Sequence, residues 1–317
     1  MLHDCDAEII PIEPDAGNAA AGIASTIVMV CEAVSIPYRL FKYANSGTSA
    51  NDNSMRYLCV LTIAGSDSCG GAGVQADIKT MSALGVYAAS AITSVTVQNT
   101  LGVKAIQAIE PAIVAGQIKA VMDDVKPVAI KIGMVNDCAT IHAIADSLSS
   151  YSPSKLVVDP VMTSTSGSML MQRDALEVFC SELLPMATLL TPNIPEAEVL
   201  SKTEIHTVDD MDVAAKRILA MGCKAVLIKG GHLEGNKKID KLYLNDGTVH
   251  TFVHATINTR NTHGTGCTLS SAIASFMALA HAKEYLSQAL EAGKDVEIGE
   301  GHGPVCHLFN PEKTIIL

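Results

Sequence analysis

From Tyr57 onwards, short apolar runs alternate with longer segments in which apolar residues recur at helical spacing. The apolar runs predict buried strands at 58–64, 88–97, 128–132, 156–158, 188–191 and 225–228. The periodic segments predict helices at 74–84, 111–125, 137–149, 268–279 and 283–292, and another opened by Asn193 and Glu196. A turn sequence at 245–247 suits a two-residue hairpin loop. This alternation predicts an α/β fold with a mostly parallel central sheet and helices on both faces.

Residues 1–56 differ in composition from the rest of the chain. They combine Pro11 and Pro14 with acidic residues and an alanine-rich patch, and they end in a polar cluster at 45–54. Such a cluster is typical of a linker. We therefore expect an N-terminal extension and linker at 1–56, in which the sequence indicates no chemistry, and one α/β domain at 57–317.

The chain of 317 residues is acidic, with a net charge of −11. Because no lysine and arginine cluster offsets this charge, the sequence argues against nucleic acid or an acidic membrane as a partner. The nine cysteines include no Cys-x-x-Cys pair, and several lie in apolar runs, which favours reduced thiols over a disulfide framework. No apolar run reaches the roughly 18 residues of a spanning helix, and the run at 19–31 follows acidic residues, unlike a signal peptide. We expect a soluble, cytoplasmic protein.

The segment 261–271 carries the clearest functional pattern. Gly264 and Gly266 can adopt positive φ angles that aim backbone N–H groups into one concavity, just before the predicted helix 268–279. Such a helix N-terminus suits a phosphate oxygen or a phosphoryl transition state. Cys267 lies in the first turn, where the helix dipole lowers a thiol pKa towards neutrality and lets the thiol act as a base. The alternative is a glycine turn before a buried helix, with Cys267 as a small core residue.

The sequence argues against two familiar nucleotide motifs, which leaves a dinucleotide oxidoreductase as a distant alternative. The pattern Gly71-x-Gly73-x-x-Ala76 matches a loose dinucleotide fingerprint, which needs an acidic residue about 20 positions further on to bind the ribose. The sequence has no acidic residue between Asp77 and Glu110. No Gly-Lys-Ser/Thr follows any of the glycines, so a P-loop is also absent from the sequence.

Polar or small residues follow each predicted strand, and parallel strands bring their carboxyl ends to one edge of the sheet. We therefore expect a group of side chains near Cys267 that comprises Gly65, Asp67, Gln98, Met134, Asp159, Asn193, Glu196 and Lys229.

With these residues in place, the sequence closely resembles the hydroxymethylpyrimidine/phosphomethylpyrimidine kinases of thiamine synthesis, which belong to the ribokinase-like superfamily. The resemblance covers 58–309 and rests on the order and spacing of the segments at 64–67, 70–73, 98–100, 131–134, 159–162, 191–193, 229–232 and 263–267. It implies a three-layer α/β/α fold. It also implies transfer of the γ-phosphoryl group of ATP, with Mg²⁺, to 4-amino-5-hydroxymethyl-2-methylpyrimidine and then to its monophosphate.

The resemblance also implies roles for individual residues. The pyrimidine would be held by Gly65, Gln98 and Met134, and Asp77 is either a further ligand or a partner of the helix dipole. The amides of Gly264, Thr265, Gly266 and Cys267 would stabilise the transferring phosphoryl group, with Cys267 as base or orienter. ATP would be bound by Lys229, Asn193, Thr262 and His263. Glu196, with Asn193, would serve the Mg²⁺ water shell, assisted by Asp159.

Several alternatives remain open at the level of sequence. A pyridoxal or pyridoxine kinase shares the fold and the chemistry, and a catalytically silent regulatory paralogue belongs to another class. A metal site from His302, Cys306 and His307 is disfavoured, because the family has a similar tail without a structural metal. By resemblance we also expect a homodimer. The extension has no counterpart in the family core, and we do not expect the thiaminase-like activity that follows the kinase in some relatives.

Overall fold

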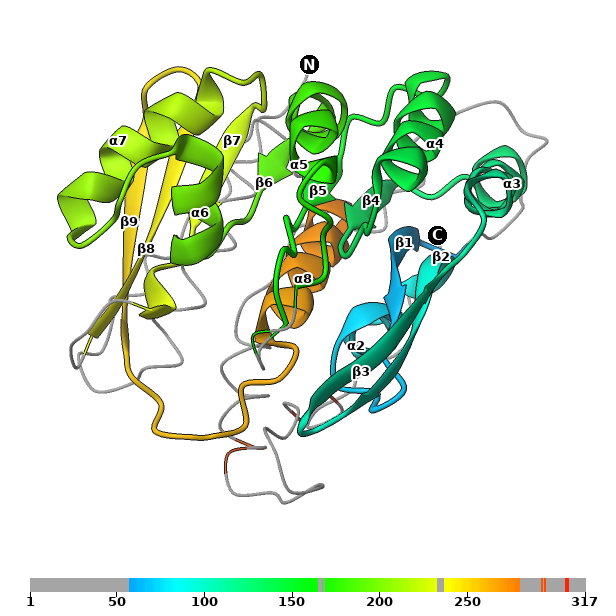
Figure 1. Cartoon of the computed structure of the whole chain (residues 1–317), viewed down its shortest axis with the longest axis horizontal. Coiled ribbons are helices and arrows are strands. Elements are labelled where there is room, and N and C mark those ends of the chain that lie inside the picture. Colours follow the sequence, from blue (N-terminus) through cyan, green and yellow to red (C-terminus); the bar gives the residue numbers. More distant parts are fainter. Residues whose placement is uncertain are drawn as a thin grey trace, which may run out of the picture.

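The computed structural model describes residues 57–164, 167, 169–232, 237–279, 292, 294, 306 and 307. In this part of the chain a nine-stranded sheet lies between two layers of helices, so the predicted three-layer α/β/α fold is confirmed (Figure 1). The predicted helix at 283–292 lies mostly outside the described residues, as do the extension 1–56 and the side chain of His302.

The sheet has the strand order β3-β2-β1-β4-β5-β6-β7-β8-β9. Neighbouring strands from β2 to β7 in this order are parallel, whereas β3, β8 and β9 are antiparallel to their neighbours. The strands are β1 (Cys59–Ser66), β2 (Tyr87–Asn99), β3 (Gly102–Ala108), β4 (Ala129–Ile132), β5 (Leu156–Val158), β6 (Leu189–Leu190), β7 (Ala225–Ile228), β8 (Lys237–Leu244) and β9 (Val249–Ala255).

Two hydrophobic layers hold the helices to the sheet. The helices are α2 (Gly73–Ala83), α3 (Pro111–Asp124), α4 (Cys138–Ser149), α5 (Ala175–Val178), α6 (Ile194–Ser201), α7 (Val208–Leu219) and α8 (Thr265–Leu279). A π-helical turn (Phe179–Leu183) and a 3-10 turn (Leu184–Met186) continue α5, and another 3-10 turn is Gly230–His232. Leu156 and Val158 of β5 pack in the layer of α3 to α7, whereas Val157 faces α2 and α8. Burial on both faces explains the continuous apolar runs.

The predicted strands and the described predicted helices are all present, with bounds within a few residues. The sequence interpretation missed β3, α5 and α7. It was also wrong about the β8–β9 loop, which comprises the four residues 245–248 rather than two. Gly247 adopts a φ of +90° there and donates its N–H to the Leu244 carbonyl oxygen at 3.1 Å. The Leu244 N–H donates to the Thr248 carbonyl oxygen at 2.9 Å, so the last residue of β8 pairs with Thr248 just before β9.

Among the residues that the structure describes, no helix combines the length and the apolarity that crossing a bilayer requires.

Candidate active site

The carboxyl ends of the parallel strands lie at one edge of the sheet, and the N-terminus of α8 lies beside them (Figure 1). The side chain of Lys229, directly after β7, forms an ion pair with that of Asp159, directly after β5, at 2.9 Å between Nζ and Oδ1. A Cβ atom on Gly266 of α8 would lie 3.4 Å from Asp159 Oδ2 and 3.5 Å from Lys229 Nζ. The first turn of α8 therefore directly adjoins this ion pair.

Asp159 and Lys229 are both charged in their buried setting. Burial acts to raise the pKa of the Asp159 carboxyl, but the Lys229 and Lys131 ammonium groups outweigh this effect and lower it. Burial likewise acts to lower the pKa of Lys229, whereas Asp159 and Glu196 raise it overall. Thr191 donates to Asp159 Oδ1 at 2.9 Å, and Ser270 of α8 lies 3.4 Å from Oδ2. The site thus holds a fixed carboxylate and a fixed cation next to a helix N-terminus.

Asn193 and Glu196 form the N-terminal capping box of α6. The Asn193 side chain accepts from the Glu196 N–H at 2.9 Å, and Glu196 Oε2 accepts from the Asn193 N–H at 2.8 Å. A backbone bridge between Asn193 and Lys229 joins this cap to the end of β7. Burial raises the pKa of Glu196 to about 7, and the Asp159 charge adds to this effect while Lys229 opposes it.

The turn before α8 depends on Gly264. Its φ is +81°, and a Cβ atom there would lie 1.7 Å from the carbonyl oxygen of Gly71. Gly266 does not adopt a positive φ, in contrast to the sequence interpretation, because α8 already begins at Thr265. The first helical hydrogen bond of α8 runs from the Thr268 N–H to the Gly264 carbonyl oxygen, at 2.8 Å. The N–H groups of Gly266 and Cys267 come before this bond, in the first turn, where N–H groups have no acceptor within the helix. This arrangement can bind an anion.

The expectation of a lowered thiol pKa at Cys267 was wrong. Burial raises the pKa of Cys267 to about 11, and the carboxylates of Asp77 and Asp159 add to this increase. The Lys131 ammonium and the backbone N–H of Gly73 oppose it without reversing it. The thiol is therefore protonated at neutral pH.

A second group of residues lies at the ends of β1, β2 and β4. A Cβ atom on Gly65 would lie 2.7 Å from Ser94 Oγ and 3.1 Å from Met134 Sδ, so only glycine leaves the space that Met134 and Ser94 occupy. The Gln98 amide nitrogen lies 3.5 Å from Nε2 of His263, which belongs to the turn before α8. These contacts bring the predicted substrate residues Gly65, Met134 and Gln98 to the same edge of the sheet.

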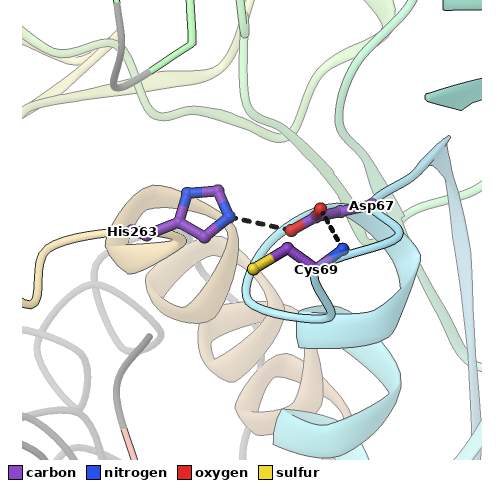
Figure 2. Close-up of side chains that lie close together, drawn as sticks. All are labelled: Asp67, Cys69 and His263. Carbon is purple, nitrogen blue, oxygen red and sulfur yellow. Dashed lines mark hydrogen bonds and ion pairs between the residues drawn. The ribbon is translucent and has the colours of Figure 1, made fainter. Parts of the chain in front are cut away.

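The sequence interpretation assigned no role to Asp67, which organises the loop before α2. Its carboxylate accepts hydrogen bonds from the N–H groups of Cys69, Gly71 and Ala72, at 2.8, 3.1 and 2.8 Å. It also accepts from His263 Nε2 at 2.8 Å, and Figure 2 shows this pair beside the thiol of Cys69. His263 is 7% exposed and bonded to Asp67, and a contact of His263 with ATP stays a prediction. In the sequence, the one local signal for this role was the position of Asp67 before a glycine-rich loop.

Asp77 does not lie at the site surface, and its predicted role as a substrate ligand is not supported. Its side chain is fully buried between the sheet and the α2–α8 layer. Its two oxygens lie 2.9 Å from Lys131 Nζ, and they also accept hydrogen bonds from Thr62 and Ser271. Asp77 is therefore the acceptor of a buried ion pair that joins α2 and α8 to strands β1 and β4. Lys131, the other partner, was not singled out from the sequence.

The Thr262 carbonyl accepts hydrogen bonds from the N–H of Thr265, at 3.3 Å, and from Thr265 Oγ1, at 3.1 Å. These bonds shape the turn before α8. A contact of Thr262 with ATP stays a prediction.

Comparisons with known proteins identify the family of this chain. The protein is 48% identical over 257 residues to the hydroxymethylpyrimidine/phosphomethylpyrimidine kinase of Rhizobium meliloti, covering 78% of this chain and 96% of that one. It is 40% identical over 320 residues to the thiamine biosynthesis bifunctional protein ThiED of Geobacter sulfurreducens, covering 96% of this chain. The protein spans only 64% of the length of that bifunctional relative.

Solved structures of two kinases also match this chain. The crystal structure of phosphomethylpyrimidine kinase from Clostridium difficile is 45% identical, with a TM-score of 0.63, and covers 75% of this chain and 96% of that one. An ADP complex of Bacillus subtilis pyridoxal kinase is 33% identical, with a TM-score of 0.71, and covers 80% and 98%. A family model described as phosphomethylpyrimidine kinase matches residues 67–306. The chain thus belongs to the phosphomethylpyrimidine kinase family.

Proposed function

We propose that the protein transfers the γ-phosphoryl group of ATP to the hydroxymethyl group of 4-amino-5-hydroxymethyl-2-methylpyrimidine, and a second phosphoryl group to the resulting monophosphate. One observation carries the proposal. The N-terminus of α8 adjoins the Lys229–Asp159 ion pair on one side, and through His263 it adjoins Gln98 on the other. A phosphoryl group at this helix end would thus lie between a nucleotide side and a heterocycle side.

On the heterocycle side, Gln98 offers an amide that can both donate to and accept from the aminopyrimidine edge. Met134 is buried next to Gly65, where its thioether can pack on an aromatic ring. We assign the pyrimidine to Gly65, Gln98 and Met134, with His263 as a residue that orients Gln98.

On the nucleotide side, the amides of Gly264 to Cys267 would stabilise the charge of the transferring phosphoryl group, and Lys229 would neutralise ATP phosphate. The pKa of about 11 at Cys267 favours the orienting role for the thiol over the role of general base. Asn193 and Thr262 are assigned to the nucleotide as neighbours of these groups.

The carboxylates of Asp159 and Glu196 are hard oxygen donors, which suit Mg²⁺. Glu196 Oε2 accepts from Asn193, and Asp159 Oδ1 accepts from Lys229 and Thr191, so both groups would hold the ion chiefly through its water ligands. When bound, Mg²⁺ would neutralise phosphate charge during transfer. This chain's own residues would set the position of the ion's water shell.

A pair of glycine variants tests the anion site. Gly266→Ala is expected to fold normally, because the added methyl group would make contacts of 3.4 and 3.5 Å, yet it fills the space beside Asp159 and Lys229 and should lower kcat by roughly 10². Gly264→Ala should instead lose the fold of the turn, since its Cβ would overlap the Gly71 oxygen. Thermal unfolding and steady-state kinetics would separate the two. Full activity in Gly266→Ala would contradict a phosphoryl site at this helix end.

The raised pKa of Glu196 predicts a pH dependence of Mg²⁺ use. Protons compete with Mg²⁺ for the carboxylate, so the apparent Mg²⁺ affinity should rise with pH up to about 7 and level off above it. Because the folded pKa lies above the ordinary value, the stability that Glu196 contributes is present at low pH and is lost as the pH rises through about 7.

Turnover would be measured as a function of Mg²⁺ concentration at pH values from 5.5 to 8.5, spaced by about half a pH unit. Glu196→Gln keeps the capping-box geometry and should flatten the profile. Glu198→Gln on the same helix, where Glu198 accepts from the Ile205 N–H, is the matched control. An unchanged profile in Glu196→Gln would remove Glu196 from the Mg²⁺ site.

Product analysis by mass spectrometry tests the function itself. The protein would be incubated with ATP, Mg²⁺ and an excess of either hydroxymethylpyrimidine or pyridoxal. Mono- and then diphosphorylated pyrimidine, with little pyridoxal phosphate, is the expected result. Phosphorylation of pyridoxal alone would indicate a kinase of vitamin B6 salvage, an alternative that the similarity to pyridoxal kinase supports. No product from either substrate would favour a silent regulatory paralogue.

A further inference from the structure

Three side chains of different chemistry converge next to Gln98. They are the carboxylate of Asp67, the thiol of Cys69 and the imidazole of His263, and one ligand atom from each lies within 4.8 Å of the others (Figure 2). They come from the loop after β1 and the turn before α8, which are almost 200 positions apart. We propose that Asp67, Cys69 and His263 form a binding site for a thiophilic divalent cation of the Zn²⁺ class.

The distances are close to those of a tetrahedral site. Zn²⁺ bonds of about 2.0 to 2.3 Å to nitrogen, oxygen and sulfur place neighbouring ligand atoms roughly 3.3 to 3.6 Å apart. His263 Nε2 and Asp67 Oδ2 lie 2.8 Å apart and would have to separate slightly. The Cys69 thiol would have to approach by up to about 1 Å, which a side-chain rotation of this partly exposed residue can provide.

The surroundings of the three ligands also suit a cation. The charges of the Asp67 carboxylate and a Cys69 thiolate would balance a divalent ion. The N–H groups of Cys69, Gly71 and Ala72 already orient the carboxylate, as hydrogen bonds around metal ligands commonly do. Asp67 and His263 are 2% and 7% exposed, which fixes two ligands, and the partly exposed Cys69 leaves an entry side.

Binding would exchange protons for the metal. The Cys69 thiol would release one proton. The hydrogen between His263 Nε2 and Asp67 would be replaced by the metal, with the imidazole as the tautomer that carries its proton on Nδ1. The Lys79 ammonium, bonded to the Gly70 carbonyl at 2.7 Å on the same loop, adds positive charge that opposes the cation. Thiolate and imidazole ligands select Zn²⁺ or Co²⁺ over Mg²⁺, so the site differs from that of Asp159 and Glu196.

The site has a consequence for activity, which rests on the proposed function. Three protein ligands leave a fourth position open, and the Gln98 amide lies 3.5 Å from His263 Nε2. A cation there would displace the pyrimidine from Gln98. Zn²⁺ is therefore expected to inhibit competitively with the pyrimidine, and not with ATP.

Co²⁺ titration of the full chain, freed of metal by a chelator, tests binding without any need for turnover. We expect one equivalent of tetrahedral Co²⁺ with a thiolate charge-transfer band, displaced by Zn²⁺. Cys69→Ser should abolish the band and weaken Zn²⁺ binding roughly tenfold or more. Cys138→Ser, which changes a partly buried thiol at the start of α4, should keep the band, and Lys79→Gln should tighten binding.

Each opposite outcome overturns the proposal. A thiolate band that persists in Cys69→Ser, or that disappears only in Cys267→Ser, would place the metal elsewhere, and no thiolate band in the wild type would rule out the site. If Zn²⁺ inhibited the wild type and Cys69→Ser equally, the inhibition would not come from a cation beside Gln98. The proposed kinase activity would be unaffected by that result.

Discussion

Replacing Cys267 by alanine is expected to lower kcat by roughly 10² or more while the unfolding transition stays close to that of the wild type. Cys267 lies on the first turn of α8, and the backbone N–H of Gly73 lies close enough to its thiol to lower the thiol pKa in part. It lies close enough to Lys131 and Asp159 for their charges to change its pKa. A side chain held in this way can fix the direction of a substrate hydroxyl, and its loss misplaces the reacting oxygen.

The same variant distinguishes the two roles of the thiol. With a pKa of about 11, a general base would give turnover that increases with pH throughout the neutral and alkaline range. An orienting thiol would give a profile without this increase, and Cys267→Ser would retain more activity than Cys267→Ala. Turnover near the wild-type value in Cys267→Ala would remove the residue from the mechanism.

The second large effect concerns stability. Lys131→Met is expected to lower the free energy of unfolding by about 3 to 5 kcal/mol, because it leaves the carboxylate of Asp77 buried without its cation. Both side chains are fully buried, and Nζ lies 2.9 Å from both oxygens of Asp77. Hydrogen bonds from Thr62 and Ser271 would remain, but hydrogen bonds alone do not replace a positive charge in an apolar layer.

Urea unfolding of three variants would measure this effect. Lys119→Met removes the exposed partner of Asp123 and should leave the free energy of unfolding nearly unchanged, because solvent screens this pair. The double variant Lys131→Met/Asp77→Leu should recover much of the loss, because it no longer buries an unpaired charge. Equal losses in Lys131→Met and Lys119→Met would contradict a structural role for the buried pair.

The sequence predicted most of the sheet because its strands are buried on both faces and therefore appear as continuous apolar runs. It missed β3 because every residue of this edge strand, Gly102–Ala108, is partly or fully exposed and the strand contains no apolar run. It missed α7 although Thr207 and Asp210 form a capping box there, since the apolar residues of this helix form a narrow stripe among charged ones.

At the site, the sequence predicted which strand ends converge, because parallel strands share one edge. It could not predict which side chains pair. Asp67 meets His263 across 196 positions, and Asp77 meets Lys131 across 54, so no local pattern distinguishes a ligand from a structural ion pair. The direction of the Cys267 pKa shift was missed for a similar reason, since the helix end was visible in the sequence and the burial was not.

The buried ion pair also has a consequence for how the enzyme would use its helix. Ser271 lies one turn after Cys267 in α8, and it donates to Asp77, which Lys131 and Thr62 tie to the sheet. The direction of the α8 dipole is therefore fixed once the chain has folded. A phosphoryl group arriving at Gly266 would meet dipoles that need no reorganisation, so the energy of orienting them belongs to folding and not to each turnover.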